Sequence, residues 1–152
     1  MNIYVDTGGW VAYFDQSDRF HPLVTSYLQA MLLQAVDRLV TSDYGLDEAV
    51  SYLRYHVSHA TALTAFRTLS ALARAHRMTM LEVNEEIRTR AGHILEQFHD
   101  QTFSFTDRTS FALCETHHIQ HEVTVDKDFV IFGLVILPQE LARLVLSPSQ
   151  PA

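Results

Sequence analysis

The sequence predicts an α/β fold in which helices flank both faces of a central parallel sheet of four to five strands, giving three layers. Two observations predict this class. Short apolar segments rich in strand-favouring residues alternate with segments whose apolar residues recur at helical spacing, which is typical of parallel sheets with helical crossovers. The chain also has 152 residues, of which 47% are hydrophobic and 19% charged, and this suits one domain with one sizeable core.

The predicted strands are short runs of β-branched, aliphatic and aromatic residues. The first covers residues 3–5 and is followed by Asp6, by a turn over residues 7–9, and by a helix that begins near Trp10. Further strands are expected over residues 39–41, 78–83, 122–125 and 134–137. Pro138 ends the last of these, because proline cannot donate to a strand ladder.

The predicted helices carry apolar residues at helical spacing, and several begin after a capping residue. They are expected over residues 20–37, over residues 44–57, after Ser58, after Asn84 and over residues 104–118. The helix at 44–57 has an aliphatic stripe on one side and the side chains of Tyr44, Glu48, Tyr52 and Tyr55 on the other. We assign residues 1–138 to the folded domain and residues 139–152, which end in SPSQPA, to a partly disordered C-terminal tail.

Composition limits where the protein works and what it binds. The formal net charge of −7 argues against broad, purely electrostatic binding of nucleic acid, although metal ions that neutralise a local acidic cluster would permit it. A single cysteine, Cys114, excludes an internal disulfide and fits a reducing, cytoplasmic compartment. No apolar run approaches the roughly 20 residues that a membrane span needs, and we expect neither a signal peptide nor membrane binding.

Four acidic residues are expected at one edge of the sheet. Asp6 and Asp126 each follow a predicted strand, while Glu48 and Asp107 lie in the first turns of helices. In a parallel sheet these positions share the carboxyl edge, where ligands of open α/β sheets bind. Each acid alone also has an ordinary explanation, as a helix cap, a turn residue or a solvated side chain. Asp128 adds a further acid two residues after Asp126.

Taken together, the acids favour a metal site over these ordinary explanations. Two carboxylates about 4 Å apart repel by about 4 kcal/mol at an effective dielectric of 20. A fold that gathers four of them needs a cation, and all-oxygen ligation suits Mg²⁺ or Mn²⁺. Such ions activate water and stabilise the transition state of phosphodiester hydrolysis.

Four segments of the chain resemble the PIN-domain ribonucleases, and most closely the VapC-like toxins of prokaryotic toxin–antitoxin pairs. The segments are IYVDTGGWVAYFD, VTSDYGLDEAVSYL, FSFTDRTSFAL and VTVDKDF, which occur in family order across residues 3–129. The resemblance implies a three-layer PIN-like fold and a nuclease domain at residues 1–138. It implies catalytic roles for Asp6, Glu48, Asp107 and Asp126, with Asp6, Asp107 and Asp126 as metal ligands. It also implies supporting roles for Asp128, Thr106 and Thr7.

The resemblance implies a Mg²⁺- or Mn²⁺-dependent endoribonuclease that hydrolyses RNA phosphodiester bonds as the toxin of a type II pair. Its partners would be RNA, a small antitoxin protein and a second copy in a homodimer. The helix at 20–37 and the helical hairpin around 44–75 are both candidates for the dimer surface. The alternative is a non-catalytic PIN-like module that binds RNA or protein. Gly8 and Gly9 leave that alternative open, because they replace the hydroxyl residue and apolar residue usual after the Asp-Thr pair.

Other residues admit two interpretations. Nine histidines, with His117, His118 and His121 close together, suggest zinc, but no cysteine pair or HExxH motif accompanies them and a zinc site is not favoured. Tyr52 and its neighbours could stack on unpaired bases or pack against the neighbouring helix, and the sequence leaves this open. Cys114 is expected in the core.

Overall fold

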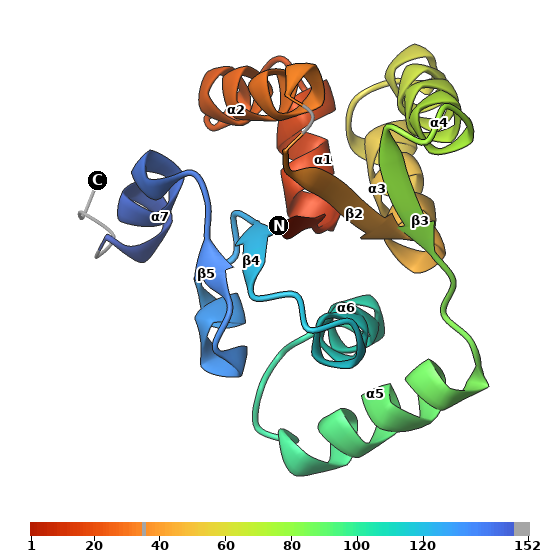
Figure 1. Ribbon diagram of the computed structural model, residues 1–152, viewed down its shortest axis with the longest axis vertical. Helices are drawn as coiled ribbons and strands as arrows, with labels where there is room; N and C mark the ends of the chain where they lie inside the picture. Colours follow the sequence, from red (N-terminus) through yellow and green to blue (C-terminus); the bar gives the residue numbers. More distant parts are fainter. Residues whose placement is uncertain (35, 148–152) are drawn as a thin grey trace.

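A computed structural model describes residues 1–34 and 36–147, which form a single parallel sheet between helices (Figure 1). The strands are β1 (Asn2–Val5), β2 (Arg38–Ser42), β3 (Met78–Leu81), β4 (His121–Val123) and β5 (Val135–Ile136). The helices are α1 (Thr7–Phe14), α2 (His21–Leu33), α3 (Asp43–His56), α4 (His59–Arg74), α5 (Glu85–Gln97), α6 (Phe105–Thr116), the 3₁₀ helix η1 (Lys127–Phe132) and α7 (Gln139–Leu146). The predicted fold class is confirmed.

The sheet is ordered β3-β2-β1-β4-β5, with every neighbouring pair parallel. The chain therefore adds β2 and β3 on one side of β1 and then returns to add β4 and β5 on the other. The strand order reverses between β1 and β4, which are hydrogen-bonded neighbours with Tyr4 level with Glu122. Their carboxyl ends flank the crevice in which open α/β sheets bind ligands.

Two apolar cores separate the sheet from its helices. On one face, Ile3 and Val5 of β1 pack into a core with residues of α1, α2 and α7. On the other face, Tyr4 joins a core that includes residues of α5, α6 and η1. This division follows from the alternation of side chains along a strand. Figure 1 shows α1 and α2 on one side of the sheet and α5 and α6 on the other.

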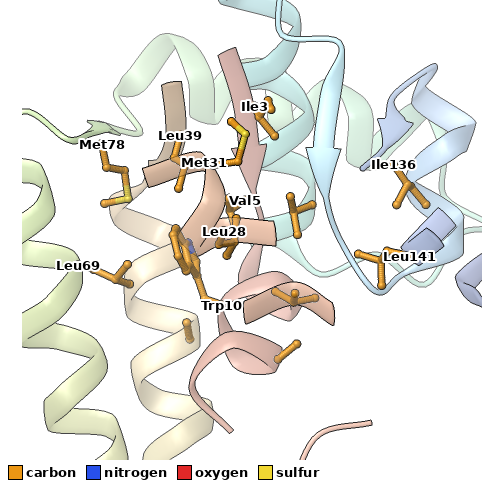
Figure 2. Packing of buried hydrophobic residues seen from close by; sticks show 14 of the residues in the cluster. Ile3, Val5, Trp10, Leu28, Met31, Leu39, Leu69, Met78, Ile136 and Leu141 are labelled. Atoms are coloured by element: carbon orange, nitrogen blue, oxygen red, sulfur yellow. The ribbon is translucent and has the colours of Figure 1, made fainter. Parts of the chain in front are cut away.

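Trp10 is the largest fully buried side chain and lies among Val5, Leu28 and Leu69 (Figure 2). Its indole nitrogen Nε1 donates to Thr41 Oγ1 at 3.0 Å, and the Thr41 hydroxyl donates in turn to the carbonyl of Val5 at 3.0 Å. A buried indole N–H needs such a partner. The two bonds hold α1 against β1 and β2 near the end of the sheet that carries Asp6.

Side-chain caps determine where several helices begin. Ser42, Ser58 and Asn84 each accept a hydrogen bond from a backbone N–H in the first turn of α3, α4 and α5 respectively. Ser58 and Asn84 are the caps expected from the sequence. Caps satisfy N–H groups that the helix itself leaves without partners. The end of α2 differs from the expectation: this helix ends at Leu33 rather than at residue 37, and residue 35 lies outside the described residues.

The C-terminal boundary differs from the expectation. Residues 139–146 were assigned to a partly disordered tail, yet they form α7, in which Leu141 and Val145 are buried in the same core as β1. The short helix is strongly amphipathic, with Leu141 and Val145 on one face, so burial of that face against the sheet stabilises it. The packed structure thus extends to Leu146, and the rest of the predicted tail, residues 148–152, lies outside the described residues. No helix among the described residues has the length and apolar character to cross a membrane.

Replacing Thr41 with valine should destabilise the protein. Valine keeps the shape of threonine but leaves the buried Trp10 Nε1–H without an acceptor, which costs about 1–3 kcal/mol. For a chain of this length, that lowers the melting temperature by roughly 3–9 °C. Thermal unfolding of Thr41→Val should show this loss, and the same change in a Trp10→Phe background should cost much less. An equal loss in both backgrounds would show that the indole bond is not responsible.

Candidate active site

Asp6 lies at the point where the strand order reverses, immediately after β1, and is only 5% exposed. It is the N-cap of α1: one carboxylate oxygen, Oδ1, accepts from the Gly9 backbone N–H at 2.7 Å. The other, Oδ2, accepts from the Thr124 hydroxyl at 2.6 Å. The pKa of Asp6 is raised to about 7. Burial is the largest cause, the carboxylates of Asp107 and Asp126 add to it, and the two hydrogen bonds oppose it.

Thr124 connects the ends of β1 and β4. Its hydroxyl donates to Asp6 and also accepts from the backbone N–H of Asp126 at 3.1 Å. The side chain is fully buried, so both bonds form away from water. Thr124 thereby fixes the orientation of the Asp6 carboxylate and the position of Asp126 relative to it. In the sequence Thr124 reads only as a residue of a predicted strand, and its position two residues before a strand-end acid is the one signal of this role.

Asp107 lies in the first turn of α6 and forms a reciprocal capping box with Ser104. The Ser104 hydroxyl accepts from the Asp107 N–H, and the Asp107 carboxylate accepts from the Ser104 N–H, both at 3.0 Å. Burial raises the pKa of Asp107, the bonds from Ser104 lower it, and the charges of Glu48 and Asp126 raise it. The ordinary capping interpretation therefore holds, and the carboxylate also lies within electrostatic reach of the other acids.

Glu48 reaches the acids from α3, where it is half-buried in the second turn. The buried hydroxyl of Tyr4 holds α3 and α6 in place. It donates to Ser42 Oγ, the cap of α3, at 3.0 Å, and lies 3.0 Å from Ser110 Oγ on α6. One tyrosine on β1 thus links the two helices that carry Glu48 and Asp107.

Asp126 caps η1 by accepting from the Asp128 N–H at 2.9 Å. Asp126 and Asp128 therefore do form a capping turn, as the ordinary explanation expects. The Asp126 charge also contributes to the raised pKa values of Asp6 and Asp107. Asp128 is half-buried in the first turn of η1. Thr7 begins α1, and Thr106 lies next to Asp107 with its carbonyl accepting from the hydroxyls of Thr109 and Ser110.

Arg108, beside Asp107, is buried and holds the segment before α6. Its guanidinium donates to the backbone carbonyls of Phe103, of Ser104 at 3.3 Å and of Gln101 at 3.1 Å. The same group lies over the Phe103 ring, 5.7 Å from its centroid. Arg108 therefore fixes the start of α6, and with it the position of Asp107. Its sequence context gave no signal for this, because an arginine in a helix is usually solvated.

Glu122 is a sixth acid at this site, and its place inside a predicted strand gives no sign of such a role. It lies in β4, level with Tyr4, is fully buried, and neither carboxylate oxygen has a hydrogen-bond partner among the described residues. Burial raises the pKa of Glu122 well above its usual range, and the charges of Asp6, Asp107 and Asp126 add to this. A carboxyl group in such surroundings is neutral, because an isolated buried charge is very costly.

The donor set fits a hard divalent cation. All the acids offer oxygen ligands. Asp6 is buried and Asp107 half-buried beside like charges, and a bound cation would relieve the repulsion between these carboxylates. Within residues 1–34 and 36–147, however, no group of three or more His, Cys, Asp or Glu side chains is already assembled as a ligand set. The same finding gives the histidines no assembled zinc site in that part of the chain.

The glycines after Asp6 have a packing explanation. A Cβ on Gly9 would lie 2.6 Å from the Val123 carbonyl oxygen and 2.9 Å from Val5 Cγ1. A Cβ on Gly8 would lie 2.8 Å from Val125 Cγ2. The start of α1 therefore approaches β1 and β4 too closely for a side chain at Gly9. Gly8 and Gly9 depart from the family pattern, which left a non-catalytic role open; the close packing of α1 against the sheet explains this departure.

The family model of the PIN domain matches residues 3–133. With most of its length matched, and with acids at the carboxyl ends of β1 and β4, the chain belongs to the PIN domain family. The family expected from the four sequence segments is confirmed.

Similar proteins come from Mycobacterium tuberculosis. The chain is 27% identical over 134 residues to "23S rRNA-specific endonuclease VapC20" of strain CDC 1551 / Oshkosh and, equally, of strain ATCC 25618 / H37Rv. In each case the match covers 88% of this chain and 95% of the relative. The crystal structure of VapC20, described as a Sarcin-Ricin loop cleaving toxin, aligns with a TM-score of 0.77 at 25% identity, covering 88% of this chain and 96% of that one.

Glu122→Gln should make stability less dependent on pH. Because burial raises the pKa of Glu122 in the folded protein, the unfolded chain releases this proton first, at about its ordinary value of 4.5. Above that pH, each unit lowers the free energy of unfolding by about 1.4 kcal/mol until the folded-state pKa is reached. Glutamine has nearly the same shape as glutamate but does not titrate. The free energy of unfolding of the variant, relative to that of wild type, should therefore increase as pH rises.

The measurement is urea unfolding of both proteins in EDTA at about pH 5 and about pH 8. The stability difference in favour of Glu122→Gln should be small at the lower pH and larger at the higher one. A difference that is the same at both values would mean that Glu122 is not held neutral in the folded protein.

Proposed function

We propose that this chain is a divalent-metal-dependent endoribonuclease and the toxin of a toxin–antitoxin pair. The observation that carries the proposal is the convergence of Asp6, Asp107, Asp126 and Glu48, from four separate segments, on the carboxyl edge where the strand order reverses. The endonuclease activity in the names of the VapC20 relatives supports the same chemistry. Phosphodiester hydrolysis is the reaction that a clustered acidic, cation-binding edge serves well.

In this proposal Asp6, Asp107 and Asp126 hold the cation, Mg²⁺ or Mn²⁺, and Glu48 orients the attacking water. The bound cation would supply a Lewis acid for the phosphate and for the departing oxygen. Thr124 keeps Asp6 oriented through its 2.6 Å bond, and the Ser104 capping box keeps Asp107 in place. Asp128, Thr7 and Thr106 support the same edge from the first turns of η1, α1 and α6.

The substrate class follows from the relatives. VapC20 is named as specific for 23S rRNA and as cleaving the sarcin–ricin loop. We therefore propose a loop of structured RNA, with ribosomal RNA as the first candidate. Unpaired loop nucleotides present their bases and backbone to a protein edge, unlike bases within an A-form helix.

The partners in this proposal are a small antitoxin and a second copy of the chain in a homodimer, acting in the cytoplasm where the RNA is. The acidic edge would attract an arginine or lysine of the antitoxin, since a guanidinium fork matches carboxylates. Such a side chain would neutralise the charges that the cation otherwise neutralises. That competition gives the antitoxin a direct physical means of inhibition.

Charge-removing variants test the catalytic assignment. Asp107→Asn and Asp126→Asn, which keep the side-chain volume and one oxygen for the capping bond, and Glu48→Gln should each lower RNA cleavage about 100-fold or more while the proteins remain folded. Cleavage of labelled RNA is measured with Mg²⁺ or Mn²⁺, with EDTA as the metal-free condition. Asp47→Asn is the matched control, because Asp47 adjoins Glu48 on α3 but is exposed. If two of the three site variants cleave at the wild-type rate, the proposed site is wrong.

A further inference from the structure

The surface of α3 carries aromatic rings that the fold does not bury. Tyr52 stacks on His56, with ring centroids 4.2 Å apart and planes 30° apart, yet Tyr52 is 44% exposed. Tyr55, on the next turn, is 82% exposed. The inner face of the same helix, with Ala49 and Leu53, is fully buried. Packing therefore does not account for these two tyrosines, and base stacking is the other role that the sequence leaves open.

These rings continue the face of α3 that carries Glu48. Tyr52 and His56 follow Glu48 at successive intervals of four residues, and Tyr55 lies seven residues after it, which places all of them on one side of the helix. At 1.5 Å per residue, Tyr52 lies about 6 Å and His56 about 12 Å along the helix axis from Glu48. Because the Glu48 charge acts on Asp107, the aromatic face begins at the proposed active site.

The charge along α3 changes sign in the same direction. The helix begins with Asp43, Asp47 and Glu48, and its last turn carries Arg54 and His56. A nucleic acid chain lying along α3 would therefore pass from the acidic, cation-binding edge to the last turn, where the guanidinium of Arg54 attracts its phosphates. Stacking suits a chain of net charge −7, because it requires no broad basic surface.

We propose that Tyr52, Tyr55 and His56 form a stacking platform for an unpaired base of the RNA substrate, beside the cleaved phosphate. The proposal rests on the proposed function and names the residues that hold a nucleotide near the site. Tyr52 is the central member: its contact with His56 fixes the ring, and its exposed surface remains free for a base. A tyrosine ring stacks on any base, so the platform positions a flexible loop nucleotide without reading its identity.

The experiment measures stacking directly and separately from cleavage. The probe is a short single-stranded oligoribonucleotide containing one 2-aminopurine, whose fluorescence falls when it stacks on an aromatic ring. Titrations are made in EDTA, so that no RNA is cleaved. Wild type should quench the probe, and Tyr52→Ala should bind it about tenfold or more weakly with reduced quenching. Tyr52→Phe should retain both properties, because only the ring is required.

Phe66→Ala on α4 is the matched control, since Phe66 is exposed to a similar extent, 48%, but lies on a different helix. It should bind the probe as wild type does. Equal binding by wild type and Tyr52→Ala, or an equal loss in Phe66→Ala, would overturn the platform. If light scattering instead shows that Tyr52→Ala converts a dimer to a monomer, α3 is a contact between two copies and the platform is likewise overturned.

The outcome for the platform is distinguishable from that for the nuclease. Asp126→Asn should lose cleavage but keep quenching that depends on Tyr52. A wild-type protein that quenches through Tyr52 yet cleaves no RNA with Mg²⁺ or Mn²⁺ would overturn the proposed nuclease and leave the platform in place. A wild-type protein that cleaves RNA at the same rate and KM as Tyr52→Ala would overturn the platform alone.

Discussion

The hydrogen bond between the Thr124 hydroxyl and the Asp6 carboxylate is the interaction on which the candidate site depends. Asp6 is buried at the junction of β1 and β4 and faces like charges, so its ionised form is stabilised within the chain by this bond and by the Gly9 N–H. The geometry that permits both bonds is demanding. It requires β4 beside β1, α1 close above both strands, and no side chain at Gly9.

In the proposed site, the same carboxylates that cap helices would also hold the cation. Asp6, Asp107 and Asp126 each cap a helix, which alone explains an acid at such a position. What capping does not explain is their convergence, because each cap would be equally effective if the three helices began far apart. Burial raises the pKa of Asp6 and Asp107, the neighbouring carboxylates raise it further, and this repulsion between like charges costs stability. This cost at one edge supports the proposal that the charges serve binding or catalysis.

Much of this arrangement could be predicted from local sequence. Acids directly after strands, and in the first turns of helices, must meet at the carboxyl edge of a parallel sheet, whatever the strand order. The order itself could not be predicted, because it depends on which strands pair across long sequence separations. The neighbouring position of β1 and β4, and with it the role of Thr124, follows only from that order. The burial of Glu122 could not be predicted for the same reason, since it lies in β4 between Tyr4 of β1 and Ile136 of β5.

Two other differences have local physical causes. Residues 139–146 pack as α7 because Leu141 and Val145 find an apolar surface beside β5. The polar, proline-containing SPSQPA that follows gives no indication of this packing. The glycines after Asp6 weaken a helix start when judged by propensity alone. In the structure they allow the close contact between α1 and the sheet, so tertiary packing outweighs propensity at that turn.

If these carboxylates form one site for a divalent cation, anomalous diffraction from crystals grown with Mn²⁺ will locate the ion among them. We expect an anomalous peak at the carboxyl edge, with carboxylate oxygens of Asp6, Asp107 and Asp126 at about 2 Å from the ion. The peak should be absent from Asp126→Asn crystals grown in the same way. Mn²⁺ bound only to surface histidines, or no peak at this edge with Mn²⁺ in excess, would contradict the account.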